Sequence, residues 1–367
     1  MKLRLIILLH IGITLLFVTC KPTAKTVLTS YGDGPYIFDL GDTTLVLTRN
    51  HNSSFDSTFL SKDEALQTQF VCEFDSISSP SLTFELNSDS LIENDAFLLP
   101  KKLLALSDIE GNFEAYYKLL LSNEVIDSSY NWTFGKGHLV IVGDLVDRGD
   151  YVTQCLWLTY HLENEAKKHG GEVHYLLGNH EQLVLLGYDN YVSEKYLSLY
   201  KDLKTDVSKI YSNKSYLTHW ISNKNAMCKI GERLFVHGGI NPKILKYNVD
   251  ISQVNSEVRR DFCTNEFKTD AANFLLTNDG ILWYRGLVVD NQKHKKIEEP
   301  QLDSILTHFQ CKSIVVGHSM VDQISKDFNG KVIRIDVDHY ENSSALLIEN
   351  GIDYITDNKG DKRQINP

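Results

Sequence analysis

The sequence predicts an α/β fold in which parallel strands alternate with helices. Each of three apolar runs of strand length ends in a polar loop: residues 103–107, 139–142 and 173–177. Helical stretches follow the first and second runs. Asp144 follows Asp108 by 36 residues and Asn179 follows Asp144 by 35, which leaves room each time for one crossover helix and one strand. The second and third runs therefore form a βαβ unit, and all three strands end at one edge of a sheet.

The size and charge of the chain restrict its class of function. Its 367 residues suffice for one large core, or for a main domain with an accessory one. Hydrophobic residues make up 42% and charged residues 23%, as is typical of a folded globular protein. The formal net charge of −11 argues against a nucleic-acid-binding surface, because phosphate backbones require clustered lysine and arginine. We therefore expect no nucleic-acid partner.

The N-terminus has the pattern of an export signal. Lys2 and Arg4 precede an apolar run over residues 5–18, which is too short to span a bilayer as a helix of the mature protein. The run stops just before Cys20, and a cysteine at that place resembles a bacterial lipoprotein cleavage site. Residues 1–19 are therefore predicted to be a signal peptide, and lipidated Cys20 would anchor an exported protein facing the periplasm or the outside. Ordinary signal cleavage beside an incidental cysteine is the alternative.

Residues 20–100 are predicted to form a tether and a strand-rich accessory region. Short apolar runs alternate there with turn residues, and serine, threonine, asparagine and aspartate are abundant. The expected strands lie at residues 36–38, 44–47, 70–72 and 82–84. Because the region contains no chemical motif, we expect a structural element that packs on the main domain.

The main domain is predicted to extend over residues 101–357. A helical insertion is expected near residues 183–225, where it forms either a cap over a pocket or plain surface helices. Apolar patterns predict further strands at 229–236, 313–316, 331–336 and 344–348, and helices within 250–280. Residues 358–367 are polar and are expected to form a frayed tail.

The predicted strand ends gather residue types that bind metal ions. These are Asp108, Glu110, Asp144, Asn179, His237 and His318. Carboxylate, amide and imidazole groups together suit a pair of divalent ions such as Mn, Fe or Zn. Two such ions share a carboxylate, and Asp144, in the middle of the βαβ unit, is the natural bridge. An ion pair of this kind activates a bridging water and polarises a phosphoryl oxygen, so attack of a metal-bridging hydroxide on a phosphoester is the reaction that fits best.

Each of these residues also has a structural interpretation. The aspartates could cap helices, the two histidines could be core residues, and Glu110 could complement a helix dipole. These interpretations fail together, because six suitable residues would have to occur at predicted strand ends by chance.

Three further residues offer groups for catalysis. His180 follows the ligand Asn179 and points in a different direction, so it can protonate the leaving oxygen as general acid. Asp147, in the opposite loop, is close enough to accept the second N–H of His180 and to fix its tautomer. Arg148 presents a planar fork that matches two phosphate oxygens.

The motifs resemble a known family. In this order they are GDLVDRG at 143–149, GNHE at 178–181, HGG at 237–239 and GHS at 317–319. Together they are similar to the calcineurin-like metallophosphoesterase superfamily, and the complete DRG and GNHE blocks narrow this to its phosphoprotein-phosphatase-like branch. LFVHGGI (234–240) and DGILWYRGL (279–287) resemble the bacterial-type Shewanella-like phosphatases within that branch. The resemblance covers roughly residues 103–348.

The resemblance implies a four-layer α/β/β/α sandwich with a site for two divalent ions: Mn, Fe or Zn, with Mg as a further option. It assigns the ligands as follows: Asp108 and Glu110 to the first ion, Asp144 to both, and Asn179, His237 and His318 to the second. Arg148 and Arg285 are expected to hold phosphate. For Arg285, beside Trp283 and Tyr284, a surface cation stacked on aromatic rings is the alternative. The implied activity is phosphoric monoester hydrolysis, on a phosphoprotein or a small phosphate ester.

One position departs from the family pattern. The family's first block is GD-x-HG, whereas this chain has SDIEGN at 107–112, so Glu110 stands where a metal-binding histidine is expected. A carboxylate favours harder ions such as Mn or Mg over zinc and weakens the Lewis acidity of the first ion. Two alternatives to monoester hydrolysis remain. One is a pyrophosphohydrolase that cleaves dinucleoside polyphosphates, since related enzymes share these blocks, and the other is a non-catalytic binding module whose site is impaired by Glu110.

Overall fold

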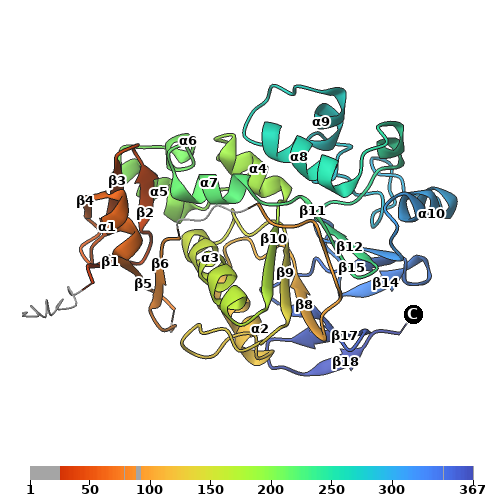
Figure 1. Ribbon diagram of the computed structural model, residues 1–367, viewed down its shortest axis with the longest axis horizontal. Coiled ribbons are helices and arrows are strands. Elements are labelled where there is room, and N and C mark those ends of the chain that lie inside the picture. The colour runs from red at the N-terminus through yellow and green to blue at the C-terminus, as the bar shows by residue number, and fades with distance from the viewer. Residues whose placement is uncertain (1–24, 78, 88–91, 342, 367) are drawn as a thin grey trace, which may run out of the picture.

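The computed structural model describes residues 25–367, apart from positions 78, 88–91, 342 and 367. Two six-stranded sheets lie face to face at its centre, and helices cover their outer faces (Figure 1). Side chains alternate along each strand, so one set packs between the sheets and the other packs under the helices. In β8 (Lys102–Leu106), Leu103 and Ala105 belong to the core between the sheets, whereas Leu104 and Leu106 belong to the core under the helices. This is the four-layer arrangement that the resemblance implied.

The first sheet contains the three strands that were predicted around the site. β8, β9 (His138–Val142) and β10 (Glu172–Leu176) are parallel neighbours. The helices α2 (Phe113–Ser122) and α3 (Val152–Lys168) connect them and lie on the outer face. Three antiparallel strands complete the sheet: β16 (Ser344–Glu349), β17 (Ile352–Asp357) and β18 (Lys362–Gln364).

The second sheet brings together segments from the rest of the chain. Its strands, in spatial order, are β14 (Ser325–Asp327), β15 (Val332–Arg334), β13 (Ser313–Val316), β12 (Arg233–Val236), β11 (Met227–Ile230) and β7 (Ala96–Phe97). The helices of this half are α8 (Ile251–Asp261), α9 (Asp270–Leu275), α10 (Glu299–His308) and the short 3-10 turns η1 (Pro242–Lys246) and η2 (Phe328–Gly330). Because β12 and β13 are parallel, the loops that follow them emerge at the same edge.

The N-terminal region forms two three-stranded sheets. One contains β1 (Val27–Tyr31), β5 (Gln69–Glu73) and β6 (Leu82–Glu85). The other contains β2 (Tyr36–Asp39), β3 (Thr43–Arg49) and β4 (Phe55–Ser61), and α1 (Lys62–Gln67) follows it. Phe84 of β6 stacks on Trp157 of α3 with ring centroids 4.3 Å apart, so this region packs directly on the main domain.

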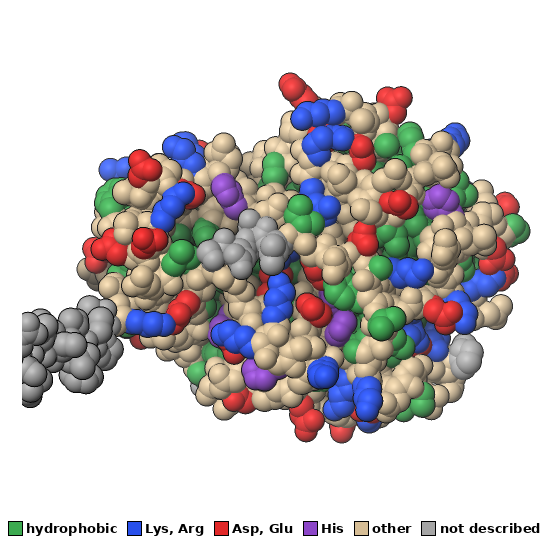
Figure 2. Space-filling model, in the orientation of Figure 1, with side chains coloured by type: hydrophobic (Ala, Val, Ile, Leu, Met, Phe, Trp, Pro, Cys, Tyr) green, Lys and Arg blue, Asp and Glu red, His purple; other side chains and the backbone are tan. Residues whose placement is uncertain are grey.

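The segment that connects β10 of the first sheet to β11 of the second is helical, as expected. It contains α4 (Asn179–Leu185), α5 (Glu194–Asp202), α6 (Val207–Ile210) and α7 (Tyr216–Ser222). α5, α6 and α7 lie beside the N-terminal strands (Figure 1). On the face shown in Figure 2, acidic and basic side chains are interspersed over both regions.

Three expectations need correction. The single strand expected at 229–236 is the hairpin of β11 and β12, because Gly231, with a φ of 60°, allows a turn between them. The C-terminal tail is not frayed throughout, since β18 pairs with β17. β7 lies within the region expected to be accessory, yet it pairs with β11 and extends the second sheet.

The predicted signal peptide, residues 1–19, and the predicted lipidation site Cys20 lie outside the described residues. Within the described part of the chain, no helix is long and apolar enough to cross a membrane.

Candidate active site

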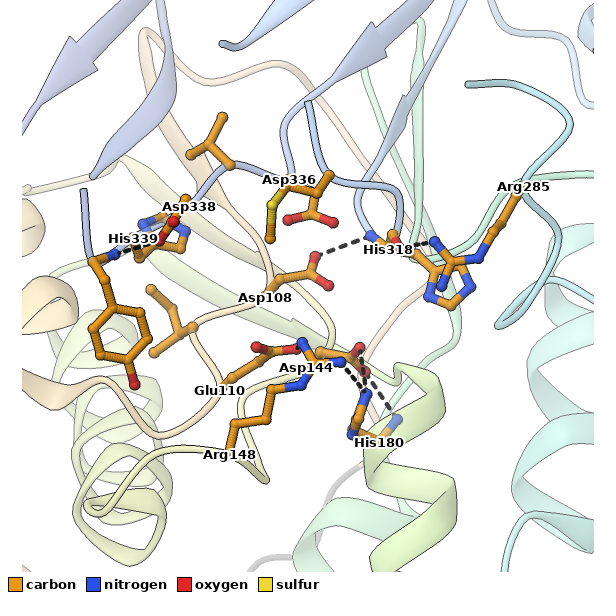
Figure 3. A pocket seen from close by; sticks show the side chains of 14 residues that line it. Asp108, Glu110, Asp144, Arg148, His180, Arg285, His318, Asp336, Asp338 and His339 are labelled. Atoms are coloured by element: carbon orange, nitrogen blue, oxygen red, sulfur yellow. Dashed lines mark hydrogen bonds and ion pairs between the residues drawn. The ribbon is translucent and has the colours of Figure 1, made fainter. Parts of the chain in front are cut away.

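A cavity of about 390 Å³ opens at the edge where the parallel strands end (Figure 3). Seven residues predicted for the site line it: Asp108, Glu110, Asp144, Arg148, His180, Arg285 and His318. The other three contact these lining residues or one another: Asp147, Asn179 and His237. The loops after five strands of the two sheets therefore meet in one place.

The backbone of these loops is held in an unfavourable conformation. Six of the predicted site residues have positive φ although none is a glycine: Asp108, Glu110, Asp144, Asp147, Arg148 and His318. Left-handed backbone is costly for residues with a Cβ, and it concentrates at functional sites where the surroundings enforce it. The tight turns direct successive side chains towards the cavity.

Two glycines allow the loops to approach each other. A Cβ on Gly178 would lie 2.1 Å from Asp144 Oδ1. Gly143 has a φ of 80°, and a Cβ there would lie 2.6 Å from His237 Nδ1. A side chain at either position would displace Asp144 or His237.

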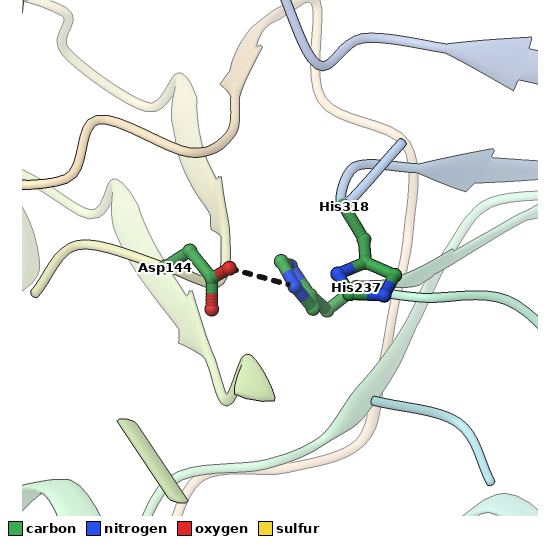
Figure 4. Close-up of side chains that lie close together, drawn as sticks. All are labelled: Asp144, His237 and His318. Carbon is green, nitrogen blue, oxygen red and sulfur yellow. Dashed lines mark ion pairs between the residues drawn. The ribbon is translucent and has the colours of Figure 1, made fainter. Parts of the chain in front are cut away.

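Asp144, His237 and His318 form the first of two donor groups (Figure 4). Their ligand atoms all lie within 4.8 Å of one another. His237 Nε2 is 3.1 Å from Asp144 Oδ2 and 2.9 Å from Asn179 Oδ1. The other ring nitrogen, Nδ1, lies 2.8 Å from the carbonyl of Val142, which leaves Nε2 to face the site. Carboxylate, amide and imidazole thus converge as a borderline divalent ion requires.

Glu110, Asp144 and His180 form the second donor group, with ligand atoms again within 4.8 Å of one another. Asp108 lies beside this group, where its Oδ2 accepts hydrogen bonds from the Ser107 hydroxyl and, at 3.0 Å, from the backbone N of His318. Burial raises the pKa of Asp108, and His237 offsets this only in part. Asp144 belongs to both groups, which is the geometry expected of a bridging carboxylate.

Glu110 is paired with Arg148. Its carboxylate accepts a hydrogen bond from the guanidinium, and 47% of the Arg148 side chain stays exposed against 12% of Glu110. Burial and the charge of Asp108 raise the pKa of Glu110 to about 7, although Arg148 opposes the shift. The residue that departs from the family pattern therefore contacts the predicted phosphate clamp.

His180 is oriented by Asp147. The two side chains meet at 2.7 Å between Nδ1 and Oδ2, so the hydrogen bond expected from the sequence is present. His180 Nε2 lies 3.4 Å from Arg148 Nη2, beside the cavity. Burial disfavours the charged ring, but Asp144 and Asp147 outweigh it and raise the pKa of His180 to about 9. In the metal-free protein the ring is therefore protonated at neutral pH.

Arg285 reaches the same cavity from another side (Figure 3). Its guanidinium donates to the carbonyl of His318 and lies 3.3 Å from Ser319 Oγ. The cation that lies over an aromatic ring at this site is Arg148, 5.7 Å from the ring centroid of Tyr191. Arg285 thus lines the cavity, and its role in phosphate binding stays a prediction.

Glu181 organises the site, although the sequence did not single it out. It is fully buried and accepts hydrogen bonds from three backbone N–H groups, those of Asp144 at 2.9 Å, Leu145 at 2.8 Å and Gly178 at 2.7 Å. The hydroxyl of Tyr175 donates to it at 2.8 Å. One carboxylate thus fixes the turn after β9 to the start of α4. Its place in the GNHE block was the available signal.

Asp336 lines the cavity and was also not predicted. It is 4% exposed, and its Oδ1 accepts no hydrogen bond from any described residue. Burial, with the charges of Asp108 and Glu110, raises the pKa of Asp336 to about 9. It ends the strand predicted at 331–336, so a polar residue at a strand end could have indicated it.

The architecture and the site agree with a match at family level. Residues 101–355 match the Metallophos family of calcineurin-like phosphoesterases. The chain belongs to this family. The resemblance inferred from the sequence blocks is confirmed, and so is the predicted fold class. The donor chemistry of the two groups fits the divalent ions that the family implies.

The chain is also similar to individual members of this family. Shewanella-like protein phosphatase 1 of Plasmodium berghei is 28% identical over 229 residues, which are 59% of this chain and 61% of the relative. The chain thus spans less than two thirds of that protein. Shewanella-like protein phosphatase 2 of Arabidopsis thaliana is 24% identical over 308 residues, 71% of this chain and 77% of the relative. The crystal structure of a cold-active protein-tyrosine phosphatase from a psychrophilic Shewanella species is similar with a TM-score of 0.80 at 30% identity, covering 91% of this chain and 99% of that one.

Proposed function

We propose that this protein is a metal-dependent phosphomonoesterase. The main support is that Asp144 is shared by two donor groups in one cavity, which Arg148 also lines. His180 belongs to the second group, but in this proposal it transfers the proton, and the neighbouring Asp108 is the ligand instead. Two divalent ions, Mn, Fe or Zn with Mg as a further option, would be held by two ligand sets: Asp108, Glu110 and Asp144, and Asp144, Asn179, His237 and His318. When bound, such a pair stabilises charge on phosphoryl oxygens and lowers the pKa of a water.

Arg148 and Arg285 supply the phosphate clamp in this proposal. They line the cavity from different sides, and a planar guanidinium donates two parallel hydrogen bonds to two phosphate oxygens. The Glu110 carboxylate accepts a hydrogen bond from the Arg148 guanidinium. As a metal ligand, Glu110 would share its negative charge with the ion, which would weaken its ion pair with Arg148 and leave the guanidinium available to the substrate.

His180 is proposed to protonate the leaving oxygen. Asp147 accepts from Nδ1, so the proton available for transfer is the one on Nε2 beside the cavity. Asp147, which is not a proposed ligand, favours the protonated ring through this hydrogen bond.

Phosphotyrosyl esters are the substrate class that we favour. The similar Shewanella structure is named a protein-tyrosine phosphatase. In this chain Tyr340 and Met320 line the cavity although they are 70% and 64% exposed, and the ring of Tyr191 lies 4.8 Å from that of His180. These side chains offer an aromatic leaving group an apolar surface at the entrance.

One observation favours a second candidate, a binding module without catalysis. Glu110 replaces the expected histidine, and its carboxylate holds Arg148. If Glu110 and Arg148 stayed paired, the site would bind an anionic ligand weakly and would not hydrolyse it.

We further propose that the protein is exported and carries a lipid at Cys20. The support is the charged and apolar N-terminal pattern that stops at this cysteine. Mass spectrometry of the protein expressed in a bacterial host should show a diacylglyceryl group on Cys20 as the first residue. Cys20→Ala should prevent both the modification and the membrane association. An unmodified mature N-terminus at another residue would support ordinary signal cleavage.

The test of the activity compares three substrates with Mn²⁺ added: p-nitrophenyl phosphate, a phosphotyrosyl peptide and a dinucleoside tetraphosphate. We expect hydrolysis of the two monoesters, and either faster turnover or a changed metal preference in Glu110→His. Dinucleotide cleavage faster than monoester cleavage would instead support a pyrophosphohydrolase. Failure of both wild type and Glu110→His on every substrate would leave only the binding module.

A further inference from the structure

Lys195 connects three parts of the chain that are far apart in sequence. Its ammonium donates to the carbonyl of Asp150 at 2.7 Å and to that of Gly32 at 3.0 Å, and it lies 3.5 Å from Asp33 Oδ2. Asp150 ends the site loop (residues 147–150), and Lys195 belongs to α5 of the helical insertion. One cation therefore ties the N-terminal region and the insertion to the backbone of the active site.

The N-terminal region presents a buried carboxylate to this cation. Asp33 is fully buried, and its Oδ1 accepts hydrogen bonds from the backbone N of Gly34 at 2.8 Å and from the hydroxyl of Tyr36 at 2.6 Å. Within the described chain, Oδ2 accepts no hydrogen bond, and Lys195 is the cation beside it. Because an uncompensated buried carboxylate is strongly destabilising, Asp33 holds Lys195 in place.

The turn that contains Asp33 is itself fixed by α3. Gln154 Nε2 donates to the carbonyl of Gly32 at 3.0 Å, and Trp157 Nε1 donates to the carbonyl of Pro35 at 3.1 Å. Both donors come from the helix that follows the site loop. The turn that contacts Lys195 is therefore held in place by two hydrogen bonds from α3.

The insertion also holds the site loop at Arg148 and the start of α3 at Thr153. The carbonyl of Tyr191 accepts from the backbone N of Arg148 at 2.8 Å, and the hydroxyl of Tyr196 accepts from the backbone N of Thr153 at 2.9 Å. Arg148 has a φ of 58°, a conformation that its surroundings must stabilise. The predicted phosphate clamp thus depends on contacts made by the insertion.

We propose that Lys195 is a positioning residue for the phosphate clamp, and that the N-terminal region supports the active site through it. Loss of the ammonium would release Asp150 from α5 and let the left-handed backbone at Arg148 relax. The guanidinium would then occupy the clamp geometry for a smaller fraction of the time, which weakens phosphate binding. The kinetic consequence, but not the structural one, rests on the proposed phosphatase function.

Hydrogen exchange of the full chain tests the structural part without turnover. In Lys195→Met, the Arg148 amide should exchange at least about tenfold faster than in wild type, while the amides of β9 stay unchanged. Lys201→Met, at an exposed lysine of the same helix, is the matched control and should behave as wild type. Lys195→Arg keeps the cation and should recover most of the protection. Should Lys195→Met not fold, Lys195→Gln, which also removes the charge, replaces it and should show the same faster exchange.

Inhibition by inorganic phosphate tests the link to the clamp. The inhibition constant should rise about five- to tenfold in Lys195→Met and should stay unchanged in Lys201→Met. Unchanged exchange or an unchanged inhibition constant in Lys195→Met would overturn the inference. Absence of turnover in wild type would instead contradict the proposed function, and the exchange experiment would still decide the role of Lys195.

Discussion

Glu110 leads to a specific pH dependence of metal binding. In the metal-free protein, burial and the charge of Asp108 raise its pKa to about 7. A ligand must lose its proton before it binds an ion, so acidification weakens binding at the ion site that contains Glu110. With a pKa of about 7, about one tenth of these carboxyl groups are ionised near pH 6 and about nine tenths near pH 8. This single group therefore changes the apparent Mn²⁺ affinity by about tenfold between the two pH values.

Comparison with Glu110→Gln isolates this contribution, because the amide keeps the shape but does not titrate. Other ligands release protons in both proteins. Although burial opposes it, Asp144 raises the pKa of His237 to about 10. The ratio of Mn²⁺ affinities near pH 8 and near pH 6 should thus be about tenfold larger for wild type than for Glu110→Gln. Calorimetric titration, or electron paramagnetic resonance of the free ion, measures both ratios. Equal ratios would refute the reasoning, because they would show that ionisation of Glu110 is not linked to metal binding between these pH values.

Three further predictions concern single side chains. His180→Gln removes the general acid and should lower kcat about 100-fold or more on a phosphate ester with a poor leaving group. The loss should be smaller on p-nitrophenyl phosphate, whose leaving group needs little protonation. Steady-state kinetics on both esters measure this, and equal losses would contradict it. Glu181→Gln should lower the free energy of unfolding by about 1–3 kcal/mol, because the amide NH₂ takes the place of an oxygen and cannot accept that oxygen's hydrogen bonds. An unchanged midpoint of urea denaturation would contradict this. With metal ions removed by a chelator, Asp336→Asn should raise the melting temperature near pH 8. The folded-state pKa of Asp336 is about 9, so the wild-type protein loses stability as the pH rises towards this value. That gain should vanish near about pH 4, where the unfolded carboxyl also holds its proton; equal calorimetric melting temperatures near pH 8 would contradict it.

Much of the fold could be predicted because its signals are local. The apolar runs that became β8, β9, β10 and β13 are buried along their length, and each is followed by polar residues of the site. The parallel order of the first three follows from the spacing of one helix between strands. The hairpin at β11 and β12 was missed because only two residues, Gly231 and Glu232, separate its strands.

The supporting residues of the site could not be predicted in the same way. Glu181 acts on backbone N–H groups of a loop that lies 36 and 37 positions earlier, and a carboxylate at the start of a helix has an ordinary role as a cap. Lys195 depends on contacts with segments 45 and 163 positions away. Such contacts arise only when the sheets and the insertion are assembled, whereas the ligands themselves are indicated by their places at strand ends.

Hydrolysis of p-nitrophenyl phosphate with added Mn²⁺ tests the central claim, that Asp144 joins two donor groups into one catalytic site. Wild type should hydrolyse the ester, and a chelator should abolish the activity. Asp144→Asn should lose at least about 100-fold in kcat/KM, since even mutation of a residue that hydrogen-bonds to a metal ligand costs about 10- to 100-fold. Circular dichroism should show that the variant retains its fold. Metal-independent hydrolysis by wild type, or equal rates in wild type and Asp144→Asn, would contradict the account.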